Sequence, residues 1–275
     1  MNRENLNYPD KKVDQRHDLI HCGINNFDKS HARLELGQFI IIVGKPNMGK
    51  TAFSITAMCN IALNDHITVA MFSLEMFNEQ VVQRIIMNTL KVRFPLEQTN
   101  ETELKELTAQ ILNKLSDVPI YLDDTASATI DEIIAKIQGL KRDKDVKVFF
   151  IDYINLIGDF CEKKRLEILR RLKDTASRLH VCIVTTCALS KGQDITIPSD
   201  NKSVATSFIK EALTEDCFEI ADNVCLLHRP GFYNHNLPKD LADMYIWDKD
   251  GKCIDTLHLI FHPEYAHFLE LPMKS

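Results

Sequence analysis

Residues 44–51 of this chain read Gly-Lys-Pro-Asn-Met-Gly-Lys-Thr, the complete pattern G-x-x-x-x-G-K-[ST]. A β-branched run at residues 39–43 precedes the pattern and predicts a buried strand, and residues 51–58 after it predict the start of a helix. In this order, backbone N–H groups and a helix N-terminus can surround an anionic phosphate chain. A chance glycine turn is the weaker alternative, because the flanking strand and helix fit the motif. The pattern therefore predicts an α/β fold built around a phosphate-binding loop.

Each residue type in the loop has a physical reason to be there. Gly44 and Gly49 allow dihedrals and a close approach that a Cβ would block. Lys50 is predicted to place its charge on the β- and γ-phosphates, and the Thr51 hydroxyl to ligate Mg²⁺. The other members of the predicted nucleotide-binding loop are Lys45, Pro46, Asn47 and Met48.

The bulk composition is that of an ordinary globular chain. At 275 residues, with 45% hydrophobic and 26% charged residues, it is long enough for one large α/β domain with a substantial core. The formal net charge is −6, so no global basic field attracts nucleic acid. A local basic loop, or a pore lined by a few lysines and arginines, stays compatible with this balance.

The eight cysteines are scattered and form no C-x-x-C pair, which argues against zinc binding and thioredoxin-type chemistry. Most lie in apolar runs, which predicts reduced, buried thiols. The N-terminus is polar and carries no apolar signal segment, and no run approaches the length of a membrane span. We therefore expect a cytoplasmic protein without a membrane partner.

The hydrophobic pattern alternates between strands and helices along most of the chain. Strands are predicted at 39–43, 69–72, 119–122, 147–151, 181–186, 223–227, 244–247 and 257–261. Helices are predicted at about 51–64, 78–91, 100–115, 129–141 and 165–180, and the stretch 191–207 reads as a long loop. Alternating strands and helices predict a mostly parallel central sheet with helices on both faces.

Two carboxylates follow predicted strands. Asp152 comes after the apolar run 148–151, at the edge of the sheet where a carboxylate can hold Mg²⁺. Glu75 comes just past the strand at 69–72, where a carboxylate can orient and polarise an attacking water. A first-turn glutamate that favours a helix N-terminus is an equal alternative for Glu75 from its position alone.

Beyond these motifs, the chain resembles the C-terminal ATPase domain of DnaB-type replicative DNA helicases over about residues 20–268. The segments Phe72-Ser73-Leu74-Glu75-Met76 and Ile151-Asp152-Tyr153-Ile154-Asn155-Leu156 make the resemblance specific, whereas the phosphate-binding loop alone is generic. Further matching segments follow in the family's order at residues 119–125, 167–173, 221–222 and 261–268.

The resemblance implies an α/β, RecA-like P-loop NTPase over residues 21–275, with residues 1–20 as a flexible arm or linker. It implies that Glu75 is the catalytic carboxylate, that Asp152 serves Mg²⁺, and that ATP is hydrolysed at the subunit interfaces of a hexameric ring. Single-stranded DNA and a primase or helicase loader are the partners it implies. The family carries a separate N-terminal domain, so we expect this chain to be the motor domain alone.

The chain departs from the family's pattern at three places. His31-Ala32-Arg33-Leu34 stands where the family usually has a Gly-Gly pair. Cys187-Ala188-Leu189 stands where the family has Ser-Gln-Leu, whose glutamine senses the γ-phosphate. Trp247-Asp248-Lys249-Asp250-Gly251 stands where the family has Lys-x-Arg-Asn-Gly, so Lys249 takes the place of the arginine finger.

Lys249 keeps the positive charge of the finger without its planar fork. A lost finger costs about 10³–10⁵ in rate in related NTPases, so the replacement predicts weak hydrolysis. A solvated turn residue is an equally good interpretation of Lys249.

Two loops correspond to the channel-facing loops of the ring helicases, at about residues 158–164 and 191–210. A few basic residues per subunit suffice there, because phosphate contacts add across a ring. As a single-chain signal, the first basic cluster fits a solvated helix start better. The candidate DNA-binding residues are Lys163, Lys164, Arg165, Lys191, Lys202 and Lys210.

Two functions of different classes remain open. The first is an ATP-driven, DnaB-like helicase motor that moves on single-stranded DNA. The second is a RecA-fold nucleotide-binding module with weak or no helicase activity, acting as a regulatory or assembly partner in replication or recombination. A metabolic kinase with the same loop is weaker, because it does not explain the segments at 72–76 and 151–156.

Overall fold

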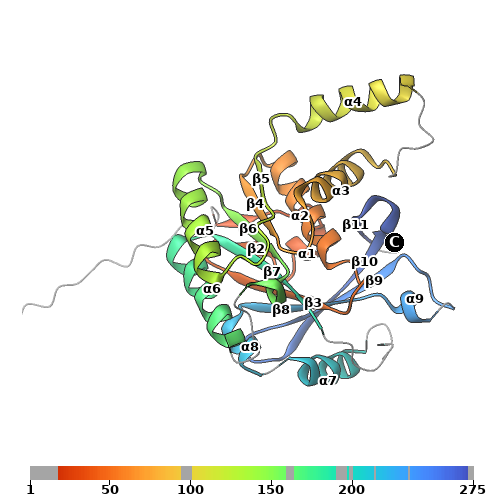
Figure 1. The fold of residues 1–275 in the computed structure, drawn as a ribbon. Coiled ribbons are helices and arrows are strands. Elements are labelled where there is room, and N and C mark those ends of the chain that lie inside the picture. The colour runs from red at the N-terminus through yellow and green to blue at the C-terminus, as the bar shows by residue number, and fades with distance from the viewer. Residues whose placement is uncertain are drawn as a thin grey trace, which may run out of the picture.

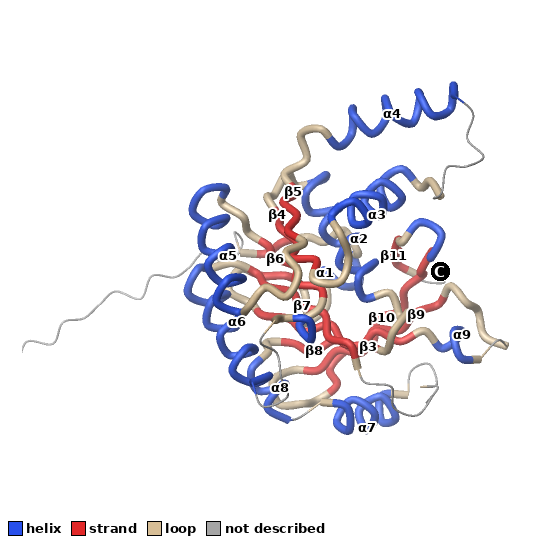
Figure 2. The backbone as a smooth tube through the Cα atoms, in the orientation of Figure 1, coloured by secondary structure: helices blue, strands red, loops and turns tan. Residues whose placement is uncertain are grey.

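The computed structural model describes residues 18–93, 101–158, 164–189, 197, 201–213, 215–234 and 236–271. Within these residues, nine strands form one sheet in the order β11-β10-β9-β8-β3-β7-β6-β4-β5 (Figures 1 and 2). These strands are β3 (Phe39–Gly44), β4 (Val69–Ser73), β5 (Ile120–Asp123), β6 (Val148–Asp152), β7 (Cys182–Ala188), β8 (Asn223–His228), β9 (Leu241–Trp247), β10 (Cys253–His262) and β11 (His267–Glu270). A separate antiparallel pair joins β1 (Leu19–Ile20) to β2 (Leu34–Glu35).

The six strands from β8 to β5 in this order are parallel to one another. The strands β9, β10 and β11 add to the β8 edge as an antiparallel meander. The predicted α/β fold, with a mostly parallel sheet around the loop-bearing strand β3, is therefore confirmed.

Helices cover both faces of the sheet, as Figure 1 shows. One face packs against α5 (Ile130–Lys144), α6 (Arg165–Leu179), α7 (Lys202–Ala212) and α8 (Glu215–Ile220). The other packs against α1 (Asn25–Asp28), α2 (Lys50–Asn64) and α3 (Asn78–Leu90). The helix α4 (Glu101–Leu115) contacts α3, and the short elements are α9 (Pro230–Tyr233) and the 3₁₀ turns η2 (Ile154–Leu156) and η4 (Pro263–Tyr265).

The loop-bearing strand β3 is buried on both sides. Its residues alternate between the two cores, with Ile41 and Val43 facing the α5–α6 side and Ile40 and Ile42 facing the α2–α3 side. A strand with two buried faces needs a continuous apolar run rather than an alternating one, and this explains the sequence Phe39–Val43.

Several boundaries differ from the sequence-based expectations. The predicted loop at 191–207 is wrong for its last part, because residues from Lys202 onward form α7, which the Asn201 side chain caps by accepting from the Val204 N–H at 3.0 Å. Of the predicted arm at 1–20, Leu19 and Ile20 instead form β1, while residues 1–17 lie outside the described residues. The strand β11 carried no clear sequence signal.

The seven described cysteines are free, and six of them are buried, as their apolar surroundings predicted. Across the described part of the chain, none of the helices combines the length and apolar character needed to cross a bilayer.

Candidate nucleotide-binding site

The carboxyl ends of the parallel strands meet at one edge of the sheet. The register pairs Gly44 at the end of β3 with Ala188 of β7, and Ser73 at the end of β4 with Asp152 of β6. The chain continues from β3 toward β4 on one side, whereas β8 lies on the other side of β3. Open α/β sheets bind ligands in the crevice at such a switch point, outside the carboxyl ends of the strands. The fold therefore brings the phosphate-binding loop and both predicted carboxylates to one place.

The loop itself has the backbone that its glycines predict. Gly49 is the N-cap of α2 with φ +100°, and a Cβ there would lie 2.9 Å from the ring of Phe268. A Cβ on Gly44 would lie 2.8 Å from the carbonyl oxygen of Leu227 in the neighbouring strand β8. Both positions therefore require glycine, one for its dihedral and one for the close strand.

Lys50 lies on the first turn of α2 and points back over the loop. Its ammonium group donates to the carbonyl oxygens of Gly44 at 2.8 Å and Lys45 at 3.0 Å. Burial lowers the pKa of Lys50 from its usual value, and the negative charges of Asp152 and Glu75 act in the opposite direction. The ammonium is thus held between the loop and the carboxylates, where an anionic phosphate would replace carbonyl partners.

Thr51 and Asp152 lie side by side although they are far apart in sequence. The Thr51 hydroxyl donates to Asp152 Oδ2 at 2.7 Å, and the Thr186 hydroxyl of β7 donates to Asp152 Oδ1. The Thr51 hydroxyl and the Asp152 carboxylate thus offer two oxygen ligands at one place. This fits Mg²⁺, which prefers hard oxygen ligands and keeps several waters. Thr186 was not foreseen, although a polar residue at the carboxyl end of a buried strand is a usable signal.

Glu75 is exposed at the mouth of this site. The turn that carries it is held by the Ser73 hydroxyl, which donates to the Met76 carbonyl at 2.7 Å, and by the Leu74 N–H, which donates to the Asp152 carbonyl at 2.8 Å. Burial, followed by the charges of Glu75 and Asp152, raises the pKa of Tyr153. The negative charges of Glu75 and Asp152 therefore both raise the pKa of Tyr153 and of Lys50, which is expected if the two carboxylates belong to one site.

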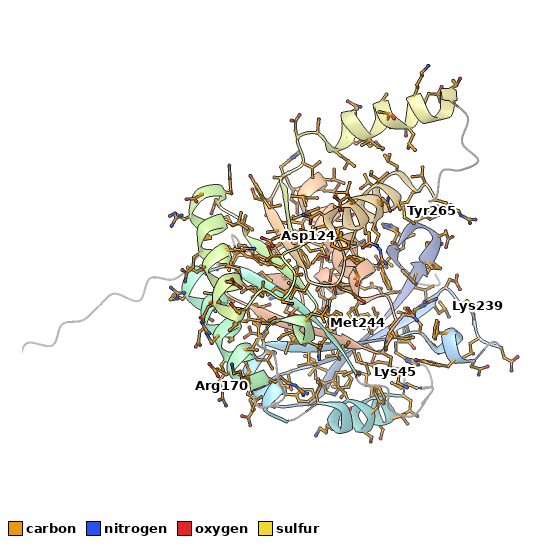
Figure 3. The ribbon with its side chains drawn as sticks, viewed as in Figure 1. Lys45, Asp124, Arg170, Lys239, Met244 and Tyr265 are labelled. Carbon is orange, nitrogen blue, oxygen red and sulfur yellow. The ribbon has the colours of Figure 1, made fainter. Side chains whose placement is uncertain are left out.

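The next segment along β5 completes the support of this turn. The Asn78 N–H at the start of α3 donates to Asp124 Oδ2 at 2.8 Å, and Asp124 is labelled in Figure 3. Its neighbour Asp123 accepts from the Lys136 ammonium at 2.6 Å. Burial raises the pKa of Asp123, but the hydrogen bonds from Lys136 and Thr125 outweigh it and lower that pKa.

On the other side of the loop, aromatic residues cover Lys45. Its ammonium lies 5.6 Å from the ring centre of Phe208 on α7 and 5.2 Å from that of Tyr233 on α9, and Figure 3 labels Lys45 beside α7. Tyr233 stacks in turn on His228, whose Nε2 accepts from the Ile197 N–H at 3.2 Å. The helix α7 and Ile197, both of which come between β7 and β8 in sequence, are therefore linked to the loop through these rings.

The segment that matches the family's Ser-Gln-Leu lies at the end of β7, with Ala188 at the place of the glutamine. Cys187 is buried at the end of β7, and burial raises its pKa to about 11. The next residue, Ala188, donates its N–H to the Asn155 side-chain oxygen at 3.0 Å, and the Leu189 N–H donates to the Gly44 carbonyl at 3.2 Å. Asn155 therefore joins η2 to the strand end beside the loop.

Lys249 lies at the end of the strands that is opposite to the phosphate-binding loop. It is exposed in the turn between β9 and β10, which Asp248 braces by accepting from the N–H groups of Asp250 and Lys252. Because β9 is antiparallel to β8 and its Trp247 pairs with Val224, its end lies away from the carboxyl end of β3. Lys249 is thus not part of its own chain's loop site.

The candidate DNA-binding residues fall into three groups. Lys164, Lys202 and Lys210 are exposed, the last two on α7 rather than on a loop. Arg165 at the start of α6 is half-buried and lines a pocket with Ile154, Cys187 and Cys217. Lys163 and Lys191 lie outside the described residues.

The sheet order, the loop and the carboxylates at its edge define a P-loop nucleotide-binding protein of the RecA-like class. The DnaB-like helicase C terminal domain family matches residues 20–270, so the chain belongs to that family. The replicative DNA helicase DnaC of Bacillus subtilis is 30% identical over 265 residues, which are 93% of this chain and 57% of that protein. The chain thus spans a little over half the length of this curated relative.

Solved structures agree with this fold. A separately solved ATPase domain superposes with a TM-score of 0.76 at 23% identity, covering 92% of this chain and 91% of that one. A DnaB-like replicative helicase, studied with its interactions with primase, superposes with a TM-score of 0.75 at 22% identity, covering 92% of this chain and 62% of that one. At these identities the likeness is one of fold.

Proposed function

We propose that this chain is the ATP-hydrolysing motor of a DnaB-like replicative helicase, which moves along single-stranded DNA. The observation that carries the proposal is the convergence of Lys50, Thr51, Asp152 and Glu75 at one edge of the sheet, in a chain of the DnaB-like family. These residues come from three different strand ends, and each matches the chemistry that ATP hydrolysis needs.

The chain's own residues would divide the work as follows. The loop N–H groups and the Lys50 ammonium bind phosphate oxygens and neutralise their charge. Thr51 and Asp152 hold Mg²⁺, which when bound screens the phosphate charge that develops during transfer. The exposed Glu75 carboxylate accepts a hydrogen bond from the attacking water and so aims it at the γ-phosphate.

Lys249 enters this proposal only through a neighbour. Because it lies at the sheet edge away from its own loop, it can reach a nucleotide only if a second copy presents it. A ring of six chains, with each site between one loop and the next chain's Lys249, satisfies that requirement. The family membership supports such an assembly.

Single-stranded DNA, a primase or helicase loader, and a cytoplasmic location belong to the same proposal. The exposed Lys164, Lys202 and Lys210 would contact the phosphate backbone, since repeated lysines in a ring sum their charge. Arg165 is a weaker candidate, because it is half-buried and lines a pocket.

A second candidate function rests on Ala188 and Lys249. With the methyl group of Ala188 in place of the sensing amide and an ammonium in place of a guanidinium, the chain would bind nucleotide and hydrolyse it slowly, as a regulatory or assembly partner in replication or recombination.

Steady-state ATP turnover with and without single-stranded DNA separates the two functions. The motor predicts turnover that DNA stimulates severalfold and that Lys50→Ala abolishes, because the variant loses its phosphate-binding charge. Tight ATP binding with negligible turnover that DNA leaves unchanged would favour the non-unwinding module. Equal turnover in Lys50→Ala and the parent would contradict the assigned site.

A further inference from the structure

Arg229 is a buried cation directly behind the phosphate-binding loop. It follows β8, and only 7% of its surface is exposed. Among the described residues no carboxylate pairs with it, and burial lowers its pKa. A buried charge without a counter-ion is costly to keep, and such groups gather at functional sites.

The guanidinium bridges two backbone carbonyls. Its Nη1 donates to the Asn47 carbonyl oxygen at 3.1 Å, and its Nη2 donates to the Lys239 carbonyl oxygen at 2.9 Å, in the segment before β9. The Arg229 N–H also reaches Met48 Sδ at 3.3 Å. Figure 3 labels Lys239, on the side of the molecule that carries α9.

Two aromatic rings hold the guanidinium in place. Its carbon lies 4.6 Å from the ring centre of Phe261 and 5.7 Å from that of Phe232. Phe261 stacks on Phe268 with ring centres 4.5 Å apart, and Phe268 is the ring that a Cβ at Gly49 would meet. Arg229 and the β10–β11 hairpin thus lie along the loop: Arg229 is hydrogen-bonded to it at Asn47, and Phe268 occupies the space that a side chain at Gly49 would need.

The contact with Asn47 determines how the loop presents a donor. Asn47 has φ +65°, a conformation that needs support in a residue other than glycine. In a trans peptide the C=O and the following N–H point in opposite directions. A hydrogen bond that fixes the Asn47 carbonyl toward Arg229 therefore points the Met48 N–H away from Arg229. On that side the Met48 N–H makes a long hydrogen bond to the Lys45 carbonyl at 3.4 Å.

We propose that Arg229 is a positioning residue for nucleotide binding, which fixes the Asn47–Met48 peptide so that the Met48 N–H faces the phosphate chain. Its charge, behind the peptide, also adds to the positive potential of the loop. This inference rests on the proposed function, since it assumes that the loop binds a nucleoside triphosphate. Lysine cannot fully replace Arg229, because a single ammonium lacks the planar fork that spans the Asn47 and Lys239 carbonyls.

The test measures two quantities: the Kd for a fluorescent ATP analogue at equilibrium, and KM and kcat for ATP. The variants are Arg229→Met, Arg229→Lys and a control, Arg142→Met, which removes an exposed guanidinium paired with Asp143. We expect Arg229→Met to raise Kd and KM by about tenfold with kcat nearly unchanged, and Arg229→Lys by about threefold. Arg142→Met should match the parent.

A merely structural role gives a different pattern. It lowers the melting temperature and the active fraction, so kcat falls while Kd and KM stay at the parental values, and that result would overturn the proposal. If Arg229→Met does not fold, Arg229→Lys decides, and a parental Kd in that variant would equally overturn it. A parent that binds no nucleotide would refute the proposed function itself, whereas a binding parent with unaffected variants refutes only the role of Arg229.

Discussion

At the scale of single residues, the sharpest claim concerns Glu75. It is exposed at the mouth of the site, so replacing its carboxylate with an amide should leave the fold and the loop intact. We predict that Glu75→Gln binds ATP with the parental affinity and hydrolyses it at least ~100-fold more slowly, because a neutral amide polarises the water far less than a carboxylate and cannot take its proton. Equilibrium binding and phosphate release check this. Hydrolysis at the parental rate would show that another group orients the water.

His228 gives a prediction for pH. Burial lowers its pKa from 6.5 to about 4, with the Asp243 charge acting in the opposite direction. The folded chain therefore keeps this histidine neutral, as an acceptor for the Ile197 N–H, while the unfolded chain takes up a proton below pH 6.5. Its contribution to stability is present above pH 6.5 and is lost as the pH falls toward 4.

By this linkage, His228 accounts for a loss of about 2 kcal/mol of unfolding free energy between about pH 7.5 and pH 5. The variant His228→Phe keeps the ring against Tyr233 and removes the titration. Urea unfolding at the two pH values should show a smaller acid loss in this variant. The same loss in parent and variant would mean that His228 titrates normally in the folded chain.

At the scale of elements, a buried amide joins α2, α3 and the turn before β11. The Asn88 side chain donates to the Thr56 hydroxyl at 2.9 Å and to the Ala266 carbonyl at 2.8 Å. The same hydroxyl accepts from the Phe268 N–H at 3.1 Å. This junction holds the backbone of Phe268, whose ring occupies the space that a Cβ at Gly49 would need, so it supports the loop from a distance.

We predict that Asn88→Ala lowers the free energy of unfolding by about 1–3 kcal/mol, because the Ala266 carbonyl loses its donor in a buried place. Gln83→Ala, on the exposed part of the same helix, serves as the control and should change stability little. Denaturant titration measures both. Equal effects of the two substitutions would show that the junction carries no special share of stability.

Elements with a strong pattern were predictable, and those fixed by tertiary contacts were not. The run Phe39–Val43 and the loop after it could be read directly, because a doubly buried strand and a phosphate-binding turn each need particular residues. The helix α7 could not, because its polar face resembles a loop and its anchors are distant: Trp247 donates from its indole to the Thr206 hydroxyl at 3.2 Å. Arg229 was missed because nothing adjacent in sequence shows that β8 ends beside Asn47.

At the scale of the whole molecule, the sheet separates the loop from Lys249, so any catalytic role of Lys249 requires a second chain. We predict that Lys249→Arg raises ATP turnover by about tenfold or more, because a guanidinium supplies the planar fork of a finger. Lys252→Arg in the same turn is the matched control. Unchanged turnover in Lys249→Arg would make Lys249 an ordinary surface residue.

The central claim is that chains cooperate to hydrolyse ATP on single-stranded DNA, and one dilution series tests it most directly. ATP turnover per chain is measured with DNA while the assembly state is followed by light scattering. The account predicts that turnover per chain rises steeply over the concentrations at which chains assemble, and that Glu75→Gln stays inactive throughout. Turnover per chain that is the same in the monomer and in the assembly would contradict it.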